Sequence, residues 1–180
     1  MSRKIKLYDM MKRLPQDAVA HKIDSPVGDL TLIASAAGLH ALLWNDDWLS
    51  KEFITAISRL PRTPGHPVIT RVADQLNEYF QGSRTAFDIP LCPDGTEFQL
   101  QAWQELTRIP YGKTISYQDQ AIALGDPNKV RAIGGANGRN PISIIVPCHR
   151  VIAKNGKLQG FGGGLKIKEF LLRHENPELF

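Results

Sequence analysis

The 180-residue sequence is poor in cysteine, with two residues of that type, and it contains no long apolar run. Small secreted domains built on disulfides are dense in cysteine, so that class is excluded. A helix that crosses a bilayer needs about 18 or more consecutive apolar residues, and no stretch approaches this length. Residues 1–18 are basic but lack the continuous apolar segment of a secretory signal. We therefore expect an intracellular protein in which residues 1–18 form a basic N-terminal extension.

Acidic residues are missing from part of the second half. Residues 1–94 hold 11 basic and 11 acidic side chains, whereas residues 95–180 hold 11 and 7. The stretch 127–168 contains eight Lys or Arg and no Asp or Glu. A solvated basic face is one explanation for this stretch. Its length favours the other explanation, which is a polyanionic partner such as nucleic acid.

The first half has the pattern of a small antiparallel sheet followed by helices. Apolar and polar residues alternate in three segments within residues 19–44, with turn residues between the segments. This pattern predicts a meander of three strands. Helical spacing of apolar residues predicts helices over residues 51–59, with Ser50 as a cap, and around residues 68–80. The segment TAFDIPL, residues 85–91, is predicted to be another strand, and the CPDG that follows it marks a domain boundary.

The second half begins with signals for three helices. Thr96 is expected to cap the first helix, and Ser116 to cap the second with Asp119 as its capping-box partner. Asp126 is expected to cap the third helix, with Pro127 at its first position. The last two predicted helices, with a short glycine-containing turn between them, have the pattern of a helix-turn-helix. Many pairs of packed helices share this pattern.

Two glycines, Gly134 and Gly135, lie inside the last of these helices, where each costs about 1 kcal/mol relative to alanine. Small residues let another surface approach the helix backbone closely. That surface is either a neighbouring helix or a nucleic-acid groove, in which case Arg131 and Arg139 would meet phosphates. The sequence pattern leaves both explanations open.

The segment PISIIVPCHRVI places a thiol directly before a histidine. Cys148 is compatible with four roles: a core residue, a metal ligand, a disulfide partner of Cys92, or a nucleophile. The residues ISIIV are predicted to be a buried strand or extended segment that ends at Pro147. Adjacent side chains on an extended backbone point to opposite faces. Cys148 and His149 can therefore interact only if the chain turns at Pro147 or a water joins them.

The stretch from IPYGKTISYQ to LLRHE, with NPISIIVPCHRVI at its centre, resembles the active domain of O6-alkylguanine-DNA alkyltransferases. This family is also called methylated-DNA–protein-cysteine methyltransferases, and the resemblance covers residues 96–175. It implies an α+β fold of two domains. The first, residues 19–92, is a ribonuclease-H-like α/β domain with an antiparallel meander. The second, residues 93–180, is a mainly helical winged-helix or helix-turn-helix alkyltransferase domain.

Members of this family transfer an alkyl group from O6 of guanine in DNA to their own cysteine, once per molecule. By this resemblance Cys148 is the acceptor, His149 is a base that acts through a water, and Glu175 orients the histidine. Tyr117 is the phenol that gives a proton to the departing guanine. A thiol with a pKa of about 8.5 is only a few per cent ionised at neutral pH, so formation of the nucleophilic thiolate requires a base.

The resemblance implies double-stranded DNA with alkylated guanine as the partner, and a damaged nucleotide rotated out through the minor groove. Arg131 is expected to fill the gap in the base stack. The contact with the groove is expected to involve Gly134, Gly135, Ala136 and Arg139. The substrate pocket is expected to involve Asn140, Val151, Phe161 and Gly162. Many relatives carry tyrosine at the position of Phe161 and some carry serine at that of Gly162. The range of alkyl groups, and activity on alkylated thymine, therefore stay open.

The resemblance implies no cofactor, and we expect no metal because no cysteine precedes Cys92 to complete the zinc site of some relatives. We expect a monomer without membrane contact, in the cytoplasm of a prokaryote, associated with the nucleoid, or in a nucleus. Three other classes compete. Relatives that only recognise lesions carry tryptophan in place of Cys148. A helix-turn-helix regulator would not need His149 or Glu175, and a thiol hydrolase would need an oxyanion hole.

Overall fold

The computed structural model describes residues 10–44 and 51–179. Ser50, which the sequence suggests as a helix cap, lies outside these residues. The chain divides into two compact units, Met1–Asp94 and Gly95–Phe180. Within the described residues, each helix is too short or too polar to span a bilayer.

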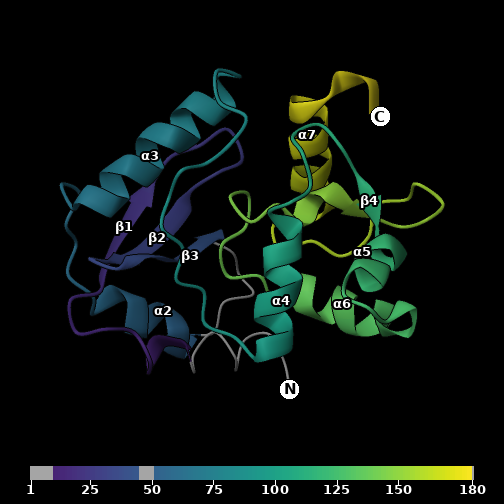
Figure 1. Cartoon of the computed structure of the whole chain (residues 1–180). Coiled ribbons are helices and arrows are strands. Elements are labelled where there is room, and N and C mark those ends of the chain that lie inside the picture. The colour runs from purple at the N-terminus through teal and green to yellow at the C-terminus, as the bar shows by residue number, and fades with distance from the viewer. Residues whose placement is uncertain (1–9, 45–50, 180) are drawn as a thin grey trace. The chain divides into compact units, whose positions relative to one another are not determined.

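The first unit is built on a three-stranded antiparallel sheet. Its strands lie in the order β1 (Val19–Ile23), β2 (Leu30–Ser35) and β3 (Gly38–Trp44), as Figure 1 shows. The predicted meander is confirmed, and Ile33 of β2 is flanked by Ala20 on one side and Ala41 on the other. Every residue of β2 is buried. Both faces of the sheet must therefore be covered.

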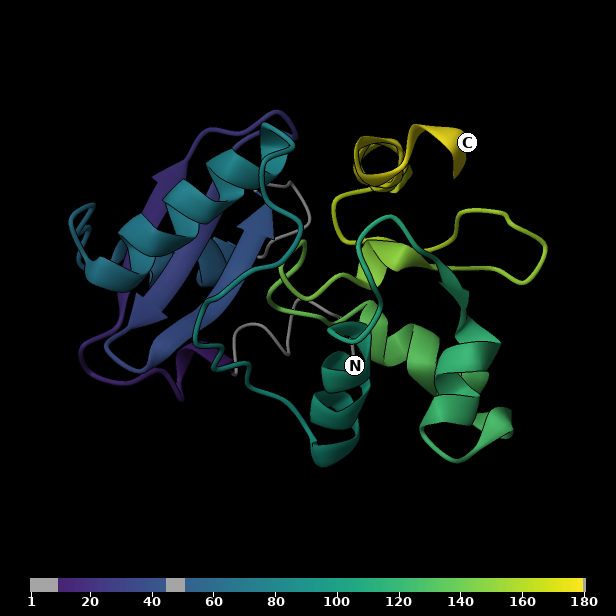
Figure 2. The ribbon, with the colours of Figure 1, turned by 45° about the horizontal axis from the view of Figure 1, so that its top comes forward.

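Two helices cover these faces. Phe53 of α2 (Lys51–Ser58) packs into an apolar cluster with Ala20 and Ile33, whereas α3 (Pro67–Phe80) packs on the opposite side against β2 and β3 (Figures 1 and 2). The strand predicted over residues 85–91 is wrong. This segment joins the sheet through an isolated bridge between Leu39 and Leu91, because Pro90 has no N–H to donate to a ladder.

The second unit is centred on three packed helices, α4 (Glu97–Leu106), α5 (Tyr117–Ala123) and α6 (Val130–Asn137). Their contact is made of small and branched residues, Ala102, Ala121, Ile133 and Ala136. The indole N–H of Trp103 donates a hydrogen bond to the backbone oxygen of Ala136 at 2.9 Å. This bond attaches α4 to the last turn of α6.

The predicted helix starts are present. Thr96 forms a capping box with Gln99, and Ser116 forms one with Asp119. Asp126 accepts a hydrogen bond from the N–H of Asn128 at 2.9 Å. The residues that it caps, Pro127–Lys129, form a 3-10 turn, so that α6 begins at Val130, three residues later than predicted.

The remaining elements surround the cysteine segment. Strands β4 (Ile115–Ser116) and β5 (Val151–Ile152) form a short parallel pair. Helix α7 (Leu165–Glu175) packs against the 3-10 turn Cys148–Arg150, which also contacts α4 (Figure 1). The thiol is thereby placed among elements that are separated widely in the sequence.

Candidate active site

The residues before the cysteine form a buried turn, and the prediction of a buried strand or extended segment over residues 142–146 is wrong. The N–H of Val146 donates to the oxygen of Ile142 at 2.9 Å, which closes a turn of the backbone. Ile144 within it has a φ of 73° and is 1% exposed. This left-handed conformation is unusual for a β-branched residue. Tertiary packing of the apolar side chains therefore decides the backbone conformation here, against local preference.

The chain turns again at Pro147, which is one of the two arrangements that the sequence left open. Pro147 has φ −84° and ψ 63°, and the N–H of Cys148 donates to the oxygen of Val146 at 2.8 Å. These values define an inverse γ-turn. Cys148 and His149 follow in the 3-10 turn and are both buried, with 6% and 0% of their surfaces exposed.

Asn140 fixes this turned segment and contacts the thiol. Its Nδ2 donates to the oxygen of Val146 at 2.7 Å and to Sγ of Cys148 at 3.3 Å. Its Oδ1 accepts from the N–H of Ile142 at 3.0 Å. A hydrogen bond donated to sulfur favours the thiolate over the thiol. Asn140 therefore shapes the loop and places a hydrogen-bond donor at the sulfur.

His149 is held by Glu175, and the two residues lie 26 positions apart in the sequence. His149 Nε2 lies 2.7 Å from Glu175 Oε1. Burial opposes ionisation of Glu175, but hydrogen bonds from His149 and Arg150 and the positive charge of Arg150 outweigh it and hold the pKa of the carboxyl below its ordinary value. An ionised carboxylate can only accept, so Nε2 carries the proton. The buried Nδ1, which has no partner among the described residues, is then the basic nitrogen.

Burial also lowers the pKa of His149 below its ordinary value, against the opposing effect of the bond to Glu175. The imidazole is therefore neutral at physiological pH. A neutral imidazole with an unoccupied Nδ1 can accept a proton from a nearby thiol.

Arg150 and Gly112 contact the candidate site, and the sequence interpretation did not name them. Arg150 donates to both oxygens of Glu175, at 2.8 and 3.0 Å, and to the oxygen of Ile109 at 2.6 Å. The N–H of Gly112 donates to Glu175 at 3.1 Å. These bonds fix the carboxylate that in turn fixes His149. Glu175, which both residues contact, shares a face of α7 with the buried Leu171 and Leu172. A charged residue at such a core-facing position was a usable signal that buried partners must surround it.

Lys168 was also missed, although it shares that face of α7. Its side chain is fully buried, and its Nζ donates to the oxygens of Val151 at 2.6 Å and Gln159 at 2.9 Å. Burial lowers the pKa of Lys168 to about 8, and the charge of Cys148 opposes this effect. The hydroxyl of Tyr117 donates to the same oxygen of Gln159 at 3.1 Å. Tyr117 and Lys168 thus meet at one carbonyl.

Tyr117 keeps its proton at neutral pH. Burial, and secondarily the charge of Cys148, raise its pKa to about 12. It begins α5 directly after the Ser116 cap, so the capping box fixes the direction in which the side chain leaves the backbone. The protonated phenol can act as a hydrogen-bond donor, as it does to the oxygen of Gln159.

The residues expected to line the pocket lie around the same segment. Val151 is fully buried, and its N–H donates to the oxygen of Cys148. The ring of Phe161 packs edge-on to that of His149, with centroids 6.4 Å apart. Gly162 follows it and is half-buried.

The exposed surface of α6 carries most of the residues expected to contact DNA. Arg131 is exposed, and Gly134 and Gly135 are half-buried. A Cβ on Gly134 would meet nothing within 4 Å, and one on Gly135 would meet the end of the Arg139 side chain. Neither glycine packs against a neighbouring helix of its own unit, so that explanation for their small size fails. Arg139 folds back and donates to the oxygen of Gly135 at 2.8 Å.

The burial of Ala136 corrects one of the expected contacts with the DNA groove. Ala136 is 1% exposed and packs in the core between α4, α5 and α6. The helical period explains this position, because Ala136 lies three residues after Ile133, which is also buried. Its side chain belongs to the core and not to the face that would meet a groove.

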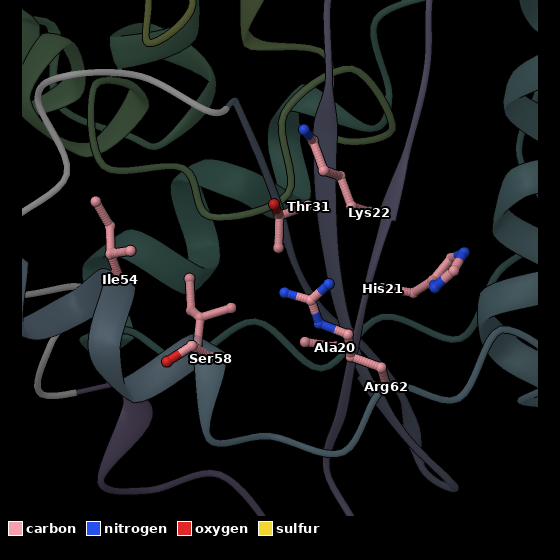
Figure 3. Close-up of a pocket in the computed structure, with 8 residues that line it drawn as sticks. Ala20, His21, Lys22, Thr31, Ile54, Ser58 and Arg62 are labelled. Carbon is pink, nitrogen blue, oxygen red and sulfur yellow. The ribbon is translucent and has the colours of Figure 1, made fainter.

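Other sites on the described residues are less suited to chemistry. No group of three or more His, Cys, Asp or Glu among them is placed to hold a metal ion. A groove of about 360 Å³ on the first unit is lined by β1, β2 and α2 and by Arg62, as Figure 3 shows. It offers neither a cysteine nor a carboxylate among its lining residues. Cys92 and Cys148 form no disulfide.

A buried cysteine next in sequence to the histidine of a His–Glu pair, in a unit that also presents a helix-turn-helix, defines a candidate thiol site on a DNA-binding type of scaffold. Residues 97–177 match the family model of the 6-O-methylguanine DNA methyltransferase DNA-binding domain, and residues 18–93 match that of the ribonuclease-like domain of the same family. The chain belongs to the 6-O-methylguanine DNA methyltransferase family.

Individual relatives agree with this membership. The chain is 48% identical over 153 residues to a methylated-DNA–protein-cysteine methyltransferase of Mycobacterium bovis, which covers 85% of this chain and 89% of that protein. The constitutive enzyme of the same name from Bacillus subtilis is 42% identical over 154 residues, covering 84% and 92%. A crystal structure of the Mycobacterium tuberculosis protein in complex with DNA superposes with a TM-score of 0.79 at 43% identity, covering 88% of this chain and 92% of that one.

Proposed function

We propose that this protein repairs DNA by transferring the alkyl group of O6-alkylguanine to Sγ of Cys148, once per molecule. Sγ attacks the alkyl carbon, an S–C bond forms, and the bond from carbon to O6 breaks with its electron pair leaving on guanine. The thioether product has no easy leaving path. Each chain is therefore consumed by one transfer.

The observation that carries the proposal is the arrangement at the thiol. Asn140 donates to Sγ at 3.3 Å, and His149 is held by Glu175 at 2.7 Å with Nδ1 unpartnered among the described residues. His149 takes the thiol proton on Nδ1, through a water. This is the nucleophile, base and orienting carboxylate of hydrolase triads, used here on an alkyl carbon.

Tyr117 supplies the proton that the departing guanine needs. Because its pKa is raised to about 12, the phenol is protonated at neutral pH and can donate. In the structure its hydroxyl donates to the backbone oxygen of Gln159 at 3.1 Å, and in the transfer the same hydroxyl donates to the guanine. The proton on His149 restores the phenol at the end of the transfer.

Double-stranded DNA containing the damaged base is the partner, and Arg131 with the open glycine face of α6 meets its minor groove. Arg131 is exposed, and a Cβ on Gly134 would have no neighbour within 4 Å. A groove can therefore approach the helix backbone closely. The compartment of action is the one that holds the DNA, which is the cytoplasm of a prokaryote or a nucleus.

The test is the intact mass of the protein after mixing with duplex DNA that contains O6-methylguanine. We expect a gain of one methyl group per chain, located on the peptide that contains Cys148. Continued product formation beyond one equivalent would indicate a hydrolase, and tight binding without a mass gain would indicate a lesion-binding protein. A methyl group on Cys92 would contradict the assignment of the acceptor.

A further inference from the structure

A buried pair of amide side chains joins α5 to α6. Nδ2 of Asn137 donates to Oε1 of Gln120 at 2.7 Å, and Nε2 of Gln120 donates back to Oδ1 of Asn137 at 3.3 Å. Nε2 of Gln120 also donates to the oxygen of Ala102 in α4 at 3.0 Å. Gln120 is fully buried and Asn137 is 6% exposed. The two amides therefore tie three helices together inside the second unit.

The surroundings of the pair make its geometry exacting. The neighbouring core residues of the same three helices are small or apolar: Ala102, Ala121, Ile133 and Ala136. Small apolar surfaces tolerate sliding of one helix along another, whereas a buried amide that loses its partner carries the full cost of desolvation. The reciprocal bonds are satisfied at one offset between α5 and α6. The pair thus selects that offset from those that the apolar core would allow.

Each member of the pair lies about one helical turn from a residue of the proposed transfer. Gln120 follows Tyr117 by three positions on α5. Asn137 ends α6 and precedes Asn140 by three positions, and the N–H of Asn140 donates to the oxygen of Asn137 at 3.2 Å. Asn140 in turn donates to Sγ of Cys148. The amide pair therefore joins the helix that begins with Tyr117 to the helix that leads into Asn140.

We propose that Gln120 and Asn137 are positioning residues for alkyl transfer, which set the placement of Tyr117 relative to Cys148. This inference rests on the proposed function of those two groups. A displacement of the order of 1 Å in a reacting pair can cost about a hundredfold in rate. Neither amide touches the substrate, so their effect on the reaction passes through the offset of the two helices.

The test is a cycle of conservative exchanges between the two amides. Gln120→Asn shortens one side chain, Asn137→Gln lengthens the other, and the double variant restores the summed length of the pair. We expect each single variant to transfer methyl groups about tenfold more slowly at saturating DNA. The double variant should recover to within about threefold of wild type, because residues in one hydrogen-bond network are coupled.

Two readouts separate positioning from a general loss of structure. Tyr117 and Cys148 act on the guanine itself, so the single variants should be slowed on free O6-methylguanine as much as on duplex DNA. Affinity for undamaged DNA should stay within about twofold of wild type, because the surface cations that meet phosphates are unchanged. Gln99→Leu is the matched control. Gln99 is another buried glutamine, which accepts from the N–H of Thr96 at 2.9 Å in the α4 cap, and its loss should lower stability without slowing transfer.

The outcomes are distinct. A wild-type protein that gains no methyl group from damaged DNA would refute the proposed function itself. If wild type transfers and the folded single variants transfer equally fast, the positioning role is overturned while the proposed function stands. A double variant that shows the product of the two single losses would also overturn it, since the two amides would then act independently.

Discussion

Replacing Glu175 by glutamine removes the charge on which the buried polar cluster of the second unit depends. The carboxylate accepts from His149 Nε2 at 2.7 Å, from Arg150 at 2.8 and 3.0 Å, and from the N–H of Gly112 at 3.1 Å. The side chains of His149, Arg150 and Glu175 are 0%, 8% and 1% exposed. Glu175→Gln therefore leaves a guanidinium buried without its counter-charge and turns one acceptor oxygen into a donor.

Breaking a buried ion pair on one side costs about 3–5 kcal/mol. For a chain of this size that corresponds to a fall in melting temperature of roughly 6–20 °C. Glu169→Gln is the matched control on the same helix. Glu169 pairs with Arg173 on the surface, where the side chain of Glu169 is 47% exposed and that of Arg173 is 51% exposed. Exposed pairs contribute about 0–1 kcal/mol, so the control should melt close to wild type.

The pH dependence supplies a second check. The pKa of Glu175 is depressed in the folded state. Its contribution to the free energy of unfolding is therefore fully present above the unfolded-state pKa of about 4.3, and it is lost as pH falls through the folded-state pKa. The difference in stability between wild type and Glu175→Gln should stay constant from about pH 5.5 upward and shrink in stronger acid. Thermal melts over this range measure it. A variant within 1 kcal/mol of wild type at pH 7 would refute the assignment of a buried, charge-balanced cluster.

Three further predictions concern the reaction and the DNA. Cys148→Ala should abolish methyl transfer, as read by intact mass, and leave affinity for duplex DNA within about twofold, because the surface cations that meet phosphates are unchanged; a retained mass gain would contradict the acceptor. Since burial depresses the pKa of His149, the single-turnover rate should stay level as pH falls through about 6.5, the ordinary value for histidine, and drop only in stronger acid; a midpoint at 6.5 would argue against a buried base. Arg131→Ala and Arg131→Lys should both slow repair of duplex DNA by roughly tenfold to a hundredfold at saturation, because lysine keeps the charge but lacks the planar head. Both variants should react at near-normal rates with the free base, which does not have to be flipped. Equal slowing on both substrates would refute a role in base flipping.

Local signals in the sequence predicted many of the elements. Alternation of apolar residues predicted β1 to β3, and the caps at Thr96 and Ser116 form as the capping-box pattern indicates. These features depend on residues a few positions apart. Failures occurred where distant contacts decide the backbone. The apolar run 142–146 looks like a strand, but it forms a buried turn in which Ile144 is left-handed.

The resemblance over residues 96–175 named the cysteine, its histidine and the carboxylate, but it did not show how they are held. Arg150 and Gly112 bind Glu175 across 25 and 63 positions of sequence, and Lys168 reaches the oxygen of Val151 from α7. Ala136 lies one helical turn from Ile133 and is buried with it. The helical period therefore places its side chain in the core and not in the expected contact with the DNA groove.

The sequence alone thus identified the residues to which the family resemblance assigns the chemistry: a thiol, an imidazole and a carboxylate, with a basic, acid-free stretch around the first two. The tertiary structure decided which atoms carry it. His149 Nδ1 is the basic nitrogen because Nε2 is occupied by Glu175, and Glu175 is ionised because His149, Arg150 and Gly112 surround it. Protonation states and tautomers depend on burial and on partners brought together by folding, and neither quantity has a local pattern in the sequence.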